Sequence, residues 1–319
     1  MTTRVAIIGA GMAGLAAARR LTAAGIEPVI FDKSRGLGGR MATRRVDGLQ
    51  FDHGVQYFTA KGLRFSALVE DWCVERMVGE WFDGGFVGTP AMTAPARAMA
   101  DGLTVVGGRA VTALERGASG WTVFNSAGVA DAPDNGAFSA VVLAVPAPQA
   151  VPIAATAGVA LPQLAAVRYA PCWALMLAFE TPLSVDWDHL RPHDGPLAWV
   201  ARNGTKLGRR GGRETLVVHA GADWSRRNLE ATQETVAALL EPHWRAATGI
   251  TSTPTFAAAH RWRYARVEET AGSPFLWDKS SRLGACGDWC LGPRVEAAFD
   301  SGEAMADAVV AGLEVGRAA

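Results

Sequence analysis

The sequence predicts an α/β protein with two parts: a larger, discontinuous domain built on a parallel sheet, and a smaller α+β domain with a mixed or antiparallel sheet. The chain opens with an apolar strand, a glycine-rich turn, an alanine-rich helix and a second apolar strand, which is the pattern of a β-α-β unit. Residues 281–313 return to a strand followed by an amphipathic helix, after a middle region with several strand-like runs. The larger domain is therefore expected to be assembled from separate pieces of the chain.

The composition is that of an ordinary soluble globular protein. Of the 319 residues, 49% are hydrophobic and 19% are charged, and the formal net charge is zero. This balance gives no reason to expect binding to nucleic acid or to a membrane. The four cysteines are scattered and form no CxxC pair, so we expect no disulfide scaffold and a reduced, cytoplasmic location. We expect a monomer or a weak homodimer.

The first half of the chain alternates strands and helices. Residues 4–8 and 27–32 read as buried strands on either side of a helix over about 13–24. Further along, the pattern predicts a helix over 64–78, a short helix ending at Gly102, a small antiparallel meander over 103–125, and a buried strand from Ala140 that prolines close.

The region from about Val151 to Val267 has a different pattern. Its apolar runs predict strands at 172–180, 196–203, 214–220 and 255–265, with a long helix over 228–248. We therefore expect the first domain to comprise residues 1–62, 96–150 and 270–319. The second domain is expected to comprise residues 63–95 and 151–269.

A glycine-rich turn, Gly9–Gly14, follows the first strand directly. In G-x-G-x-x-G the first glycine permits a tight turn, the second lets the backbone approach a pyrophosphate, and the third allows the helix to pack on the strand. The helix N-terminus offers N–H groups to the phosphates, and Asp32 can accept hydrogen bonds from ribose hydroxyls. A Rossmann-like dinucleotide site is therefore predicted, with contacts from Gly9, Gly11, Met12, Ala13, Gly14, Asp32 and Lys33.

A second glycine cluster follows Asp32 and favours one dinucleotide over another. Gly36, Gly38 and Gly39 let the chain pass close to the same pyrophosphate from its other side, and Arg40 offers a cationic fork to the phosphates. The spacing D-x5-G-G-R resembles the extended motif of FAD enzymes of the amine-oxidase and glutathione-reductase superfamily. We therefore expect an FAD-binding domain, with Gly39 and Arg40 among the contacts.

Two later segments agree with a flavin cofactor. The segment GGRAVTALE contains Val111 and resembles the strand that lies against the adenine in these flavoproteins. The segment GDWCLGPRVEAAFDSG resembles their C-terminal flavin motif, in which Asp288 would hold hydroxyls on the ribityl or pyrophosphate side. A helix starting near Val295 would aim its N–H groups at the flavin N1–C2=O edge. The expected cofactor contacts here are Val111, Asp288, Arg294, Val295 and Glu296.

The chain as a whole resembles the bacterial renalase-like family. Five segments in the right order carry the resemblance: DKSRGLGGRM, FDHGVQYFTA, ARNGTKLGR, AHRWRYAR and GDWCLGPRVEAA. The sequence departs from the family pattern at Leu207, where a proline is expected after Lys206. The resemblance implies an FAD enzyme whose partners are a reduced nicotinamide, as small-molecule substrate, and O2.

The resemblance also implies which residues meet the substrate. It places residues 51–60 beside flavin and substrate, so that Gly54 and Gln56 contact the flavin through backbone or amide groups. Tyr57 is then an active-site residue, or else a tyrosine of the interdomain core. The residues expected at the active site are Tyr57, His260, Trp289 and Asn203.

Two of these residues have a structural alternative. His260, Trp262 and Tyr264 alternate along one predicted strand and share a face, which is either a wall for a flat substrate or the packed side of the sheet. Trp289 either stacks near the flavin or packs in the core.

The expected reaction is transfer of a hydride from the 2- or 6-dihydro isomers of NAD(P)H to flavin N5, giving NAD(P)+ and, with O2, hydrogen peroxide. A dihydropyridine becomes aromatic on losing a hydride, so the site needs flat walls and correct positioning, without a strong base. One alternative is a flavin amine oxidase, which an aromatic cage with a lysine–water pair near N5 would favour, or a desaturase, which a long apolar tunnel would favour. Another is a non-catalytic FAD-binding protein.

No metal is expected. His189 and His193 lie four residues apart among aspartates, a spacing that suits a metal, but the flanking prolines favour a solvated surface loop. Cys290 is expected not to be attached covalently to the flavin.

Overall fold

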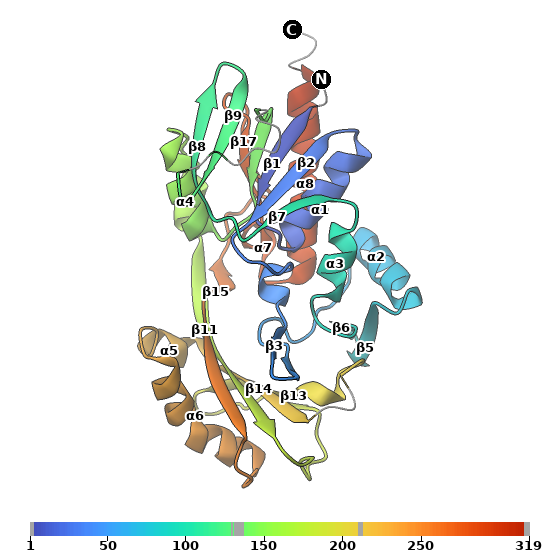
Figure 1. Ribbon diagram of the computed structural model, residues 1–319, viewed down its shortest axis with the longest axis vertical. Coiled ribbons are helices and arrows are strands. Elements are labelled where there is room, and N and C mark those ends of the chain that lie inside the picture. The colour runs from blue at the N-terminus through green and yellow to red at the C-terminus, as the bar shows by residue number, and fades with distance from the viewer. Residues whose placement is uncertain (1–2, 129, 131–136, 210–212, 316–319) are drawn as a thin grey trace.

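The computed structural model describes residues 3–128, 130, 137–209 and 213–315. Two sheets lie one above the other along the long axis of the molecule (Figure 1). All four cysteines are free. Among the described helices, none combines the length and the apolar character that crossing a membrane requires.

The first sheet has six strands, in the order β16-β17-β10-β1-β2-β7. Its strands are β1 (Arg4–Ile8), β2 (Glu27–Asp32), β7 (Thr104–Gly107), β10 (Ala140–Leu143), β16 (Leu276–Asp278) and β17 (Leu283–Ala285). All neighbours pair in parallel except β16 with β17. The expected strands at 4–8 and 27–32 are thus confirmed, and pieces far apart in the sequence form one sheet.

Both faces of this sheet are covered. Alternate residues of β1 enter two different cores, with Val5 and Ile7 on one face and Ala6 and Ile8 on the other. Helices α1 (Met12–Ala23) and α8 (Val295–Val315) cover the first face. Helix α4 (Ala147–Thr156), the 3-10 turn Pro162–Ala166 and the hairpin of β8 (Val111–Gly117) and β9 (Gly120–Asn125) cover the second.

The expected meander over 103–125 is only partly present. Strand β7 pairs in parallel with β2 at the edge of the first sheet, and only β8 and β9 form an antiparallel pair. The left-handed Gly108 separates β7 from β8 and redirects the chain between them.

The second sheet has five antiparallel strands, in the order β12-β13-β14-β11-β15. They are β11 (Arg168–Phe179), β12 (His189–Leu190), β13 (Leu197–Arg202), β14 (Glu214–Ala220) and β15 (Phe256–Glu269). Helices α5 (Ala222–Arg227) and α6 (Gln233–Thr248) cover one face, and the core there includes Leu240 and Trp244. The helix predicted over 228–248 begins later, because the Thr232 hydroxyl caps it by accepting from the Thr235 N–H.

The segment 63–95, expected in the second domain, packs on the first. It contains α2 (Leu63–Val74), β5 (Val78–Phe82) and β6 (Gly85–Gly88), followed by α3 (Ala94–Ala100). Phe65, Val69 and Trp72 belong to the same core as α1 and α8, and this burial holds the segment there. The β5–β6 hairpin nevertheless reaches the second sheet, because the Trp81 indole donates to the Thr205 hydroxyl.

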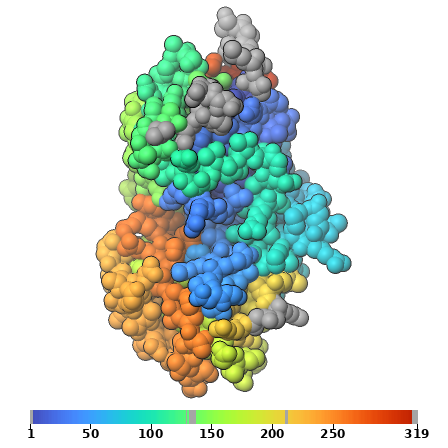
Figure 2. All heavy atoms as spheres, in the orientation of Figure 1, coloured from blue at the N-terminus to red at the C-terminus, as the bar shows by residue number. Residues whose placement is uncertain are grey.

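Two connections join the domains. The long strands β11 and β15 run from the second sheet toward the first domain (Figure 1). The hairpin of β3 (Arg44–Val46) and β4 (Leu49–Phe51) packs against the second sheet, where Phe51 meets Met176 and Val217. In Figure 2 this part of the chain, in blue, lies at the surface between the upper domain and the orange strand of the lower one. Residues just beyond β4 therefore lie where the two domains meet.

Candidate functional site

The first glycine turn forms a cradle at the N-terminus of α1. Gly9 has a φ of +115°, and a Cβ there would lie 2.5 Å from the carbonyl oxygen of Ala144. A Cβ on Gly14 would overlap the carbonyl oxygen of Gly9. At Gly11, by contrast, a Cβ would meet nothing within 4 Å. Gly9 and Gly14 are thus needed for packing, whereas Gly11 faces open space where Met12 and Ala13 begin the helix, as a pyrophosphate requires.

The second glycine cluster lies directly on this cradle. The Gly38 N–H donates to the Ala10 carbonyl at 2.9 Å, and a Cβ on Gly39 would lie 3.6 Å from the Gly11 Cα. Both Gly38 and Gly39 have positive φ, and the 3-10 turn Gly39–Met41 follows. The two clusters are therefore placed to enclose one pyrophosphate.

The end of β2 and the start of β8 lie together beside the cradle. The Asp32 carboxylate accepts from the Ala10 N–H and the Ser34 N–H, both at 2.7 Å, which fixes its orientation. The Asp32 carbonyl accepts from the Arg109 N–H, which brings Val111 to the same end. Lys33 is exposed. This arrangement fits the expected ribose and adenine end of the site.

Arg40 reaches across to the C-terminal motif. Its guanidinium makes a bidentate ion pair with the Asp288 carboxylate, with N–O distances of 2.9 and 2.6 Å. It also donates to the Ala265 carbonyl at 3.2 Å. Asp288 begins the short helix α7 (Asp288–Leu291) and is 6% exposed. Burial opposes the charge on Arg40, but Asp288 raises its pKa above the ordinary value. Arg40, which is predicted to contact phosphate, and Asp288, which is predicted to contact hydroxyl groups, are therefore paired with each other.

The N-terminus of α8 is tied to the chain after Tyr57. The Glu296 carboxylate accepts from the Lys61 N–H at 2.8 Å and from the Gly62 N–H at 2.5 Å. Its side chain is thus engaged in this bridge, while Arg294 is exposed and Val295 half-buried at the start of the helix. At this end of the helix, Val295 and Glu296 can offer their backbone N–H groups to a flavin.

The turn from Asp52 to Tyr57 is fixed from inside the protein. A Cβ on Gly54 would overlap the carbonyl oxygen of Arg40, so Gly54 permits the turn to pack on the second glycine cluster. The Gln56 amide donates to the carbonyls of Asp52 and Gly54, and its oxygen accepts from Lys206 Nζ at 3.2 Å. The Gln56 side chain is therefore engaged in contacts that shape the turn, and a contact of Gln56 with a flavin stays a prediction.

Beneath the turn lies a buried charge cluster of Asp52, Lys206 and Arg209. Asp52 Oδ2 lies 2.6 Å from Arg209 Nη2 and 3.6 Å from Lys206 Nζ. Burial alone would raise the pKa of Asp52, but the two cations hold it below its ordinary value. Burial, and to a lesser degree the positive charge of Arg209, lower the pKa of Lys206 to about 8, although Asp52 opposes this shift. The cluster thus carries one more positive than negative charge while Lys206 is protonated.

One aromatic group lies on the β15 side of the turn. The His260 ring lies 4.8 Å from His53 and 4.5 Å from Trp262, both edge-on. The Trp262 indole donates to the His53 carbonyl at 3.0 Å. Burial lowers the pKa of His260, and lowers that of both His53 and His219 to about 4, so these histidines are neutral at pH 7. Tyr264 instead packs on Tyr169.

A second aromatic group, which we call the aromatic cluster, lies on the other side of the turn. Its five rings come from the turn, from β5 and from β12–β13: Tyr57, Trp81, Phe82, His189 and Trp199. His189 stacks on Trp199 with ring centres 4.6 Å apart, so it is part of a half-buried packed strand and not of the expected solvated loop. Among the described residues no group of three potential ligands forms a metal site.

Two cations lie over rings of the aromatic cluster. Lys206 Nζ is 5.1 Å from the Trp81 ring centre. The Arg191 guanidinium is 4.9 Å from that of Trp199, and its Nη2 donates to the Tyr57 hydroxyl at 2.7 Å. Tyr57 is thus placed in a cationic, aromatic surrounding.

Two of the expected active-site residues are buried and hydrogen-bonded to other parts of the protein. Asn203 is 1% exposed; its amide donates to the Gln50 carbonyl and its oxygen accepts from the Asp52 N–H, so it joins the second sheet to the turn. Trp289 is also 1% exposed and donates to the Val145 carbonyl within the core of the first domain. Cys290 is buried beside it, and burial raises the pKa of its thiol to about 11.

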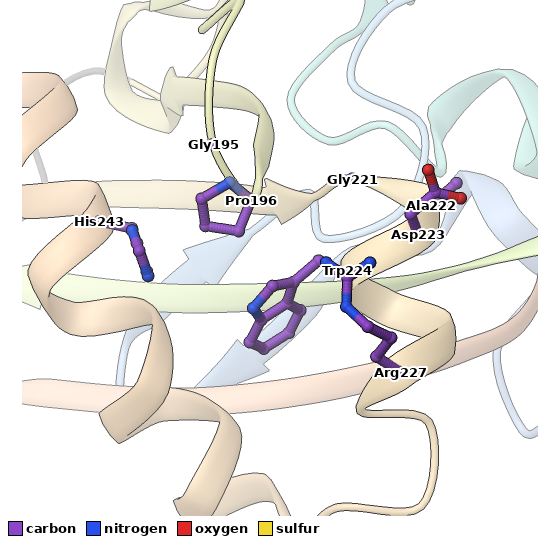
Figure 3. A pocket seen from close by; sticks show the side chains of 8 residues that line it. All are labelled: Gly195, Pro196, Gly221, Ala222, Asp223, Trp224, Arg227 and His243. Atoms are coloured by element: carbon purple, nitrogen blue, oxygen red, sulfur yellow. The ribbon is translucent and has the colours of Figure 1, made fainter.

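A surface pocket of about 510 Å³ lies apart from these groups (Figure 3). It is bordered by α5, α6 and the start of β13, and the side chains of Trp224 and His243 face it. None of the residues expected to bind cofactor or substrate lines it, so the candidate site is the junction around residues 52–57.

The sequence interpretation missed several residues at this junction. Trp81, Phe82, Arg191 and Trp199 lie on segments distant from Tyr57, and nothing in their local pattern sets them apart from core or surface residues. Lys206 and Asp52 carried a signal, because both lie within the motifs that support the family resemblance.

Comparisons with known proteins agree with this geometry. Residues 7–72 match the NAD(P)-binding Rossmann-like domain, and residues 60–310 match the flavin containing amine oxidoreductase family. A 4,4'-diapophytoene desaturase (4,4'-diaponeurosporene-forming) of Staphylococcus aureus (strain Newman) is 49% identical over 51 residues, which are 16% of this chain and 10% of the desaturase. The match therefore spans about a tenth of that relative's length.

Solved structures share the fold over nearly the whole chain. A protein from Exiguobacterium sp. 255-15 assigned as a protoporphyrinogen oxidase matches with a TM-score of 0.78 at 12% identity, over 98% of this chain and 99% of that one. Cyclohexylamine oxidase from Brevibacterium oxydans IH-35A matches with a TM-score of 0.66 at 15% identity, over 98% and 100%. At these identities the likeness shows the fold alone. Because the second family match covers most of the chain, the protein belongs to the flavin containing amine oxidoreductase family, and FAD is the cofactor that its glycine cradle fits.

Proposed function

We propose that this protein oxidises a flat, reduced nicotinamide, a 2- or 6-dihydro isomer of NAD(P)H, with release of NAD(P)+. When bound, FAD would supply a hydride acceptor at flavin N5, and O2 would be the oxidant that takes up the two electrons with protons to give hydrogen peroxide. The resemblance to renalase-like proteins supports this substrate class. The single structural observation that carries it is the pair of aromatic groups on either side of the turn 52–57.

These aromatic groups suit a planar ring. Tyr57 and Trp199 lie on one side of the turn with ring centres 5.5 Å apart, and His260 and Trp262 lie on the other. Aromatic faces hold a dihydropyridine by stacking and fix which ring carbon faces the acceptor. Loss of the hydride makes the ring aromatic, so the protein's task is to orient the ring and exclude water, without removing a proton from carbon.

The charges around the site also suit such a substrate. The cations over the aromatic cluster, Lys206 and Arg191, favour an anionic nucleotide over an ammonium ion. The neutral His53, His219 and His260 do not oppose the positive charge that develops on the nicotinamide ring.

Oxidation of an amine is the second candidate. The observation that favours it is Lys206, a buried lysine with its pKa lowered to about 8 that contacts the Trp81 ring of the aromatic cluster. The shared fold with cyclohexylamine oxidase is compatible with it. An amine substrate must reach the site as the uncharged base, because two cations already face the aromatic cluster.

Anaerobic mixing of the FAD-loaded protein with each reductant separates these candidates. We expect the 2- and 6-dihydro isomers to bleach the flavin much faster than ordinary NAD(P)H or amines such as putrescine. His260→Ala should slow bleaching and leave FAD bound, whereas His243→Ala, in the surface pocket of Figure 3, should change neither. Fast bleaching by amines alone would establish amine oxidation, and no bleaching by any reductant would favour a non-catalytic protein.

A further inference from the structure

Arg191 differs from two other arginines at the junction, Arg40 and Arg209. Arg40 and Arg209 both make close ion pairs, with Asp288 and Asp52 respectively. Arg191 is exposed, and among the described residues it has no carboxylate within ion-pair distance. A guanidinium has five N–H donors, and the hydrogen bond described for Arg191 is the one from Nη2 to Tyr57. Its other donors remain free to bind an anion.

The rings beneath Arg191 hold it in place. Its guanidinium lies 4.9 Å from the ring centre of Trp199 and 5.6 Å from that of Tyr57. This contact restrains a long side chain that is otherwise free to move, and keeps its charge beside an aromatic wall of the site. A substrate whose ring meets Tyr57 would therefore bring a group attached to that ring near Arg191.

Trp199 supplies an independent observation. Its side chain is 7% exposed, and its indole N–H has no acceptor among the described residues. A buried donor without a partner is costly, and an oxygen of a ligand that enters beside Arg191 would relieve this cost. The Arg191 guanidinium lies against the Trp199 ring, so the two side chains are adjacent members of one wall.

We propose that Arg191 and Trp199 form a phosphate subsite that determines substrate specificity. This inference rests on the proposed function, because it takes nicotinamide as the ring of the substrate. The subsite binds the phosphate of a nicotinamide nucleotide and thereby selects nucleotides over the corresponding nucleoside. Arg191 does not touch the reacting carbon, so it acts on substrate binding and not on the rate of the hydride transfer itself.

The first test compares a phosphorylated with an unphosphorylated substrate. In stopped-flow reduction, the parent protein should half-saturate at a lower concentration of the dihydronicotinamide mononucleotide than of the riboside. Arg191→Met keeps an apolar stem on the rings and should raise the half-saturating concentration of the mononucleotide about 10- to 100-fold. The limiting rate of bleaching and the half-saturating concentration of the riboside should change much less than that of the mononucleotide.

Two variants control this result. Arg191→Lys keeps the charge and should recover part of the preference for the nucleotide. Arg116→Met removes an exposed arginine that lies over a tryptophan in the same way, 5.9 Å from the Trp121 ring, but in the first domain on β8. It should leave both substrates unaffected. Equal half-saturation by nucleotide and riboside, unchanged in Arg191→Met, would overturn the subsite.

A binding measurement separates the subsite from the proposed reaction. Oxidised nicotinamide mononucleotide and nicotinamide riboside are titrated calorimetrically into the FAD-loaded protein, with inorganic phosphate as a competitor. We expect the mononucleotide to bind more tightly, phosphate to weaken it in the parent, and neither effect to survive in Arg191→Met. Should this pattern hold while no isomer bleaches the flavin, the subsite stands and the proposed reaction fails. Bleaching by the isomers without any dependence of binding on Arg191 would support the reaction and overturn the subsite.

Discussion

The two halves of the candidate site are built in different ways. The cofactor cradle comes from one continuous stretch, Gly9 to Arg40, and its shape depends on backbone contacts such as that of Gly38 with Ala10. The substrate-facing half comes from four separate segments, which contribute the turn 52–57, the hairpin β5–β6, the region 189–209 and strand β15. Side chains, not the backbone, hold that half together.

A substitution therefore has a different effect in each half. In the cradle an added methyl group either collides with the backbone or occupies the place of the ligand. In the substrate-facing half, removing one side chain leaves a charge or a donor without its partner.

The largest effect is expected at Gly14. A Cβ there overlaps the Gly9 carbonyl oxygen, so Gly14→Ala should lower the free energy of unfolding by about 5 kcal/mol or more, or prevent folding. Gly11→Ala is the matched control, because its Cβ meets no protein atom within 4 Å. It should keep the melting temperature of the FAD-free protein and still weaken FAD binding. Normal FAD affinity in Gly11→Ala would contradict the pyrophosphate assignment.

The buried charge cluster should give the next largest effect. Arg209→Met removes the closer of the two cations that face the buried Asp52 and leaves the more distant Lys206, so we expect a loss of about 3–5 kcal/mol in the free energy of unfolding. Lys206→Met keeps the closer Asp52–Arg209 pair and should change that free energy by only about 1 kcal/mol. Denaturant unfolding of the FAD-free variants measures both. Equal losses would show that the three charges act as one unit.

A smaller loss is expected at Arg40. Arg40→Ala leaves the buried Asp288 unpaired and should cost about 1.5–3 kcal/mol of unfolding free energy in the absence of FAD. Asp288→Asn and the double variant complete a double-mutant cycle that isolates the pair. FAD dissociation constants, measured separately, report whether Arg40 also contacts phosphate. No coupling in the cycle would mean that the ion pair is not formed in solution.

Much of the fold could be predicted, and the reason is local. The strand–turn–helix start, the second glycine cluster and the final helix α8 each follow from residues adjacent in the sequence. The errors have a tertiary cause. Strand β7 joined the parallel sheet because its partner β2 offered an open edge, and 63–95 packed on the first domain because Phe65 and Trp72 are buried against its core.

The substrate-facing half could be predicted only in part. Tyr57, His260 and Trp262 can be singled out in the sequence because they lie within conspicuous motifs or alternate along one strand, and their part in the site stays a prediction. Arg191 and Trp199 could not be found, since their importance comes from a contact with Tyr57 across more than a hundred residues. Trp289 shows the reverse case, in which a residue inside a flavin-like motif belongs to the core.

The smallest expected effect is a pH dependence caused by Lys206, and it also discriminates between the two candidate substrates. Burial lowers the pKa of Lys206 to about 8 from its ordinary value of 10.5. Its charge is present below pH 8 and is lost as the pH rises through 8. For an anionic nucleotide, the half-saturating concentration should therefore rise, by about tenfold or less, between pH 7 and pH 9. For an amine, which must bind as the free base, it should fall over the same interval.

The stability of the FAD-free protein provides the second measurement for this prediction. Between about pH 8 and pH 10.5 the unfolded chain retains the proton on Lys206 while the folded protein has released it. The unfolded state then binds more protons, so this residue makes the protein more stable as the pH rises through that interval. Lys206→Met should remove both this slope and the change in half-saturation near pH 8. If Lys206→Met keeps the slope and the change in half-saturation, another group titrates near pH 8. Lys206 then has no part in the choice between an anionic substrate and an amine.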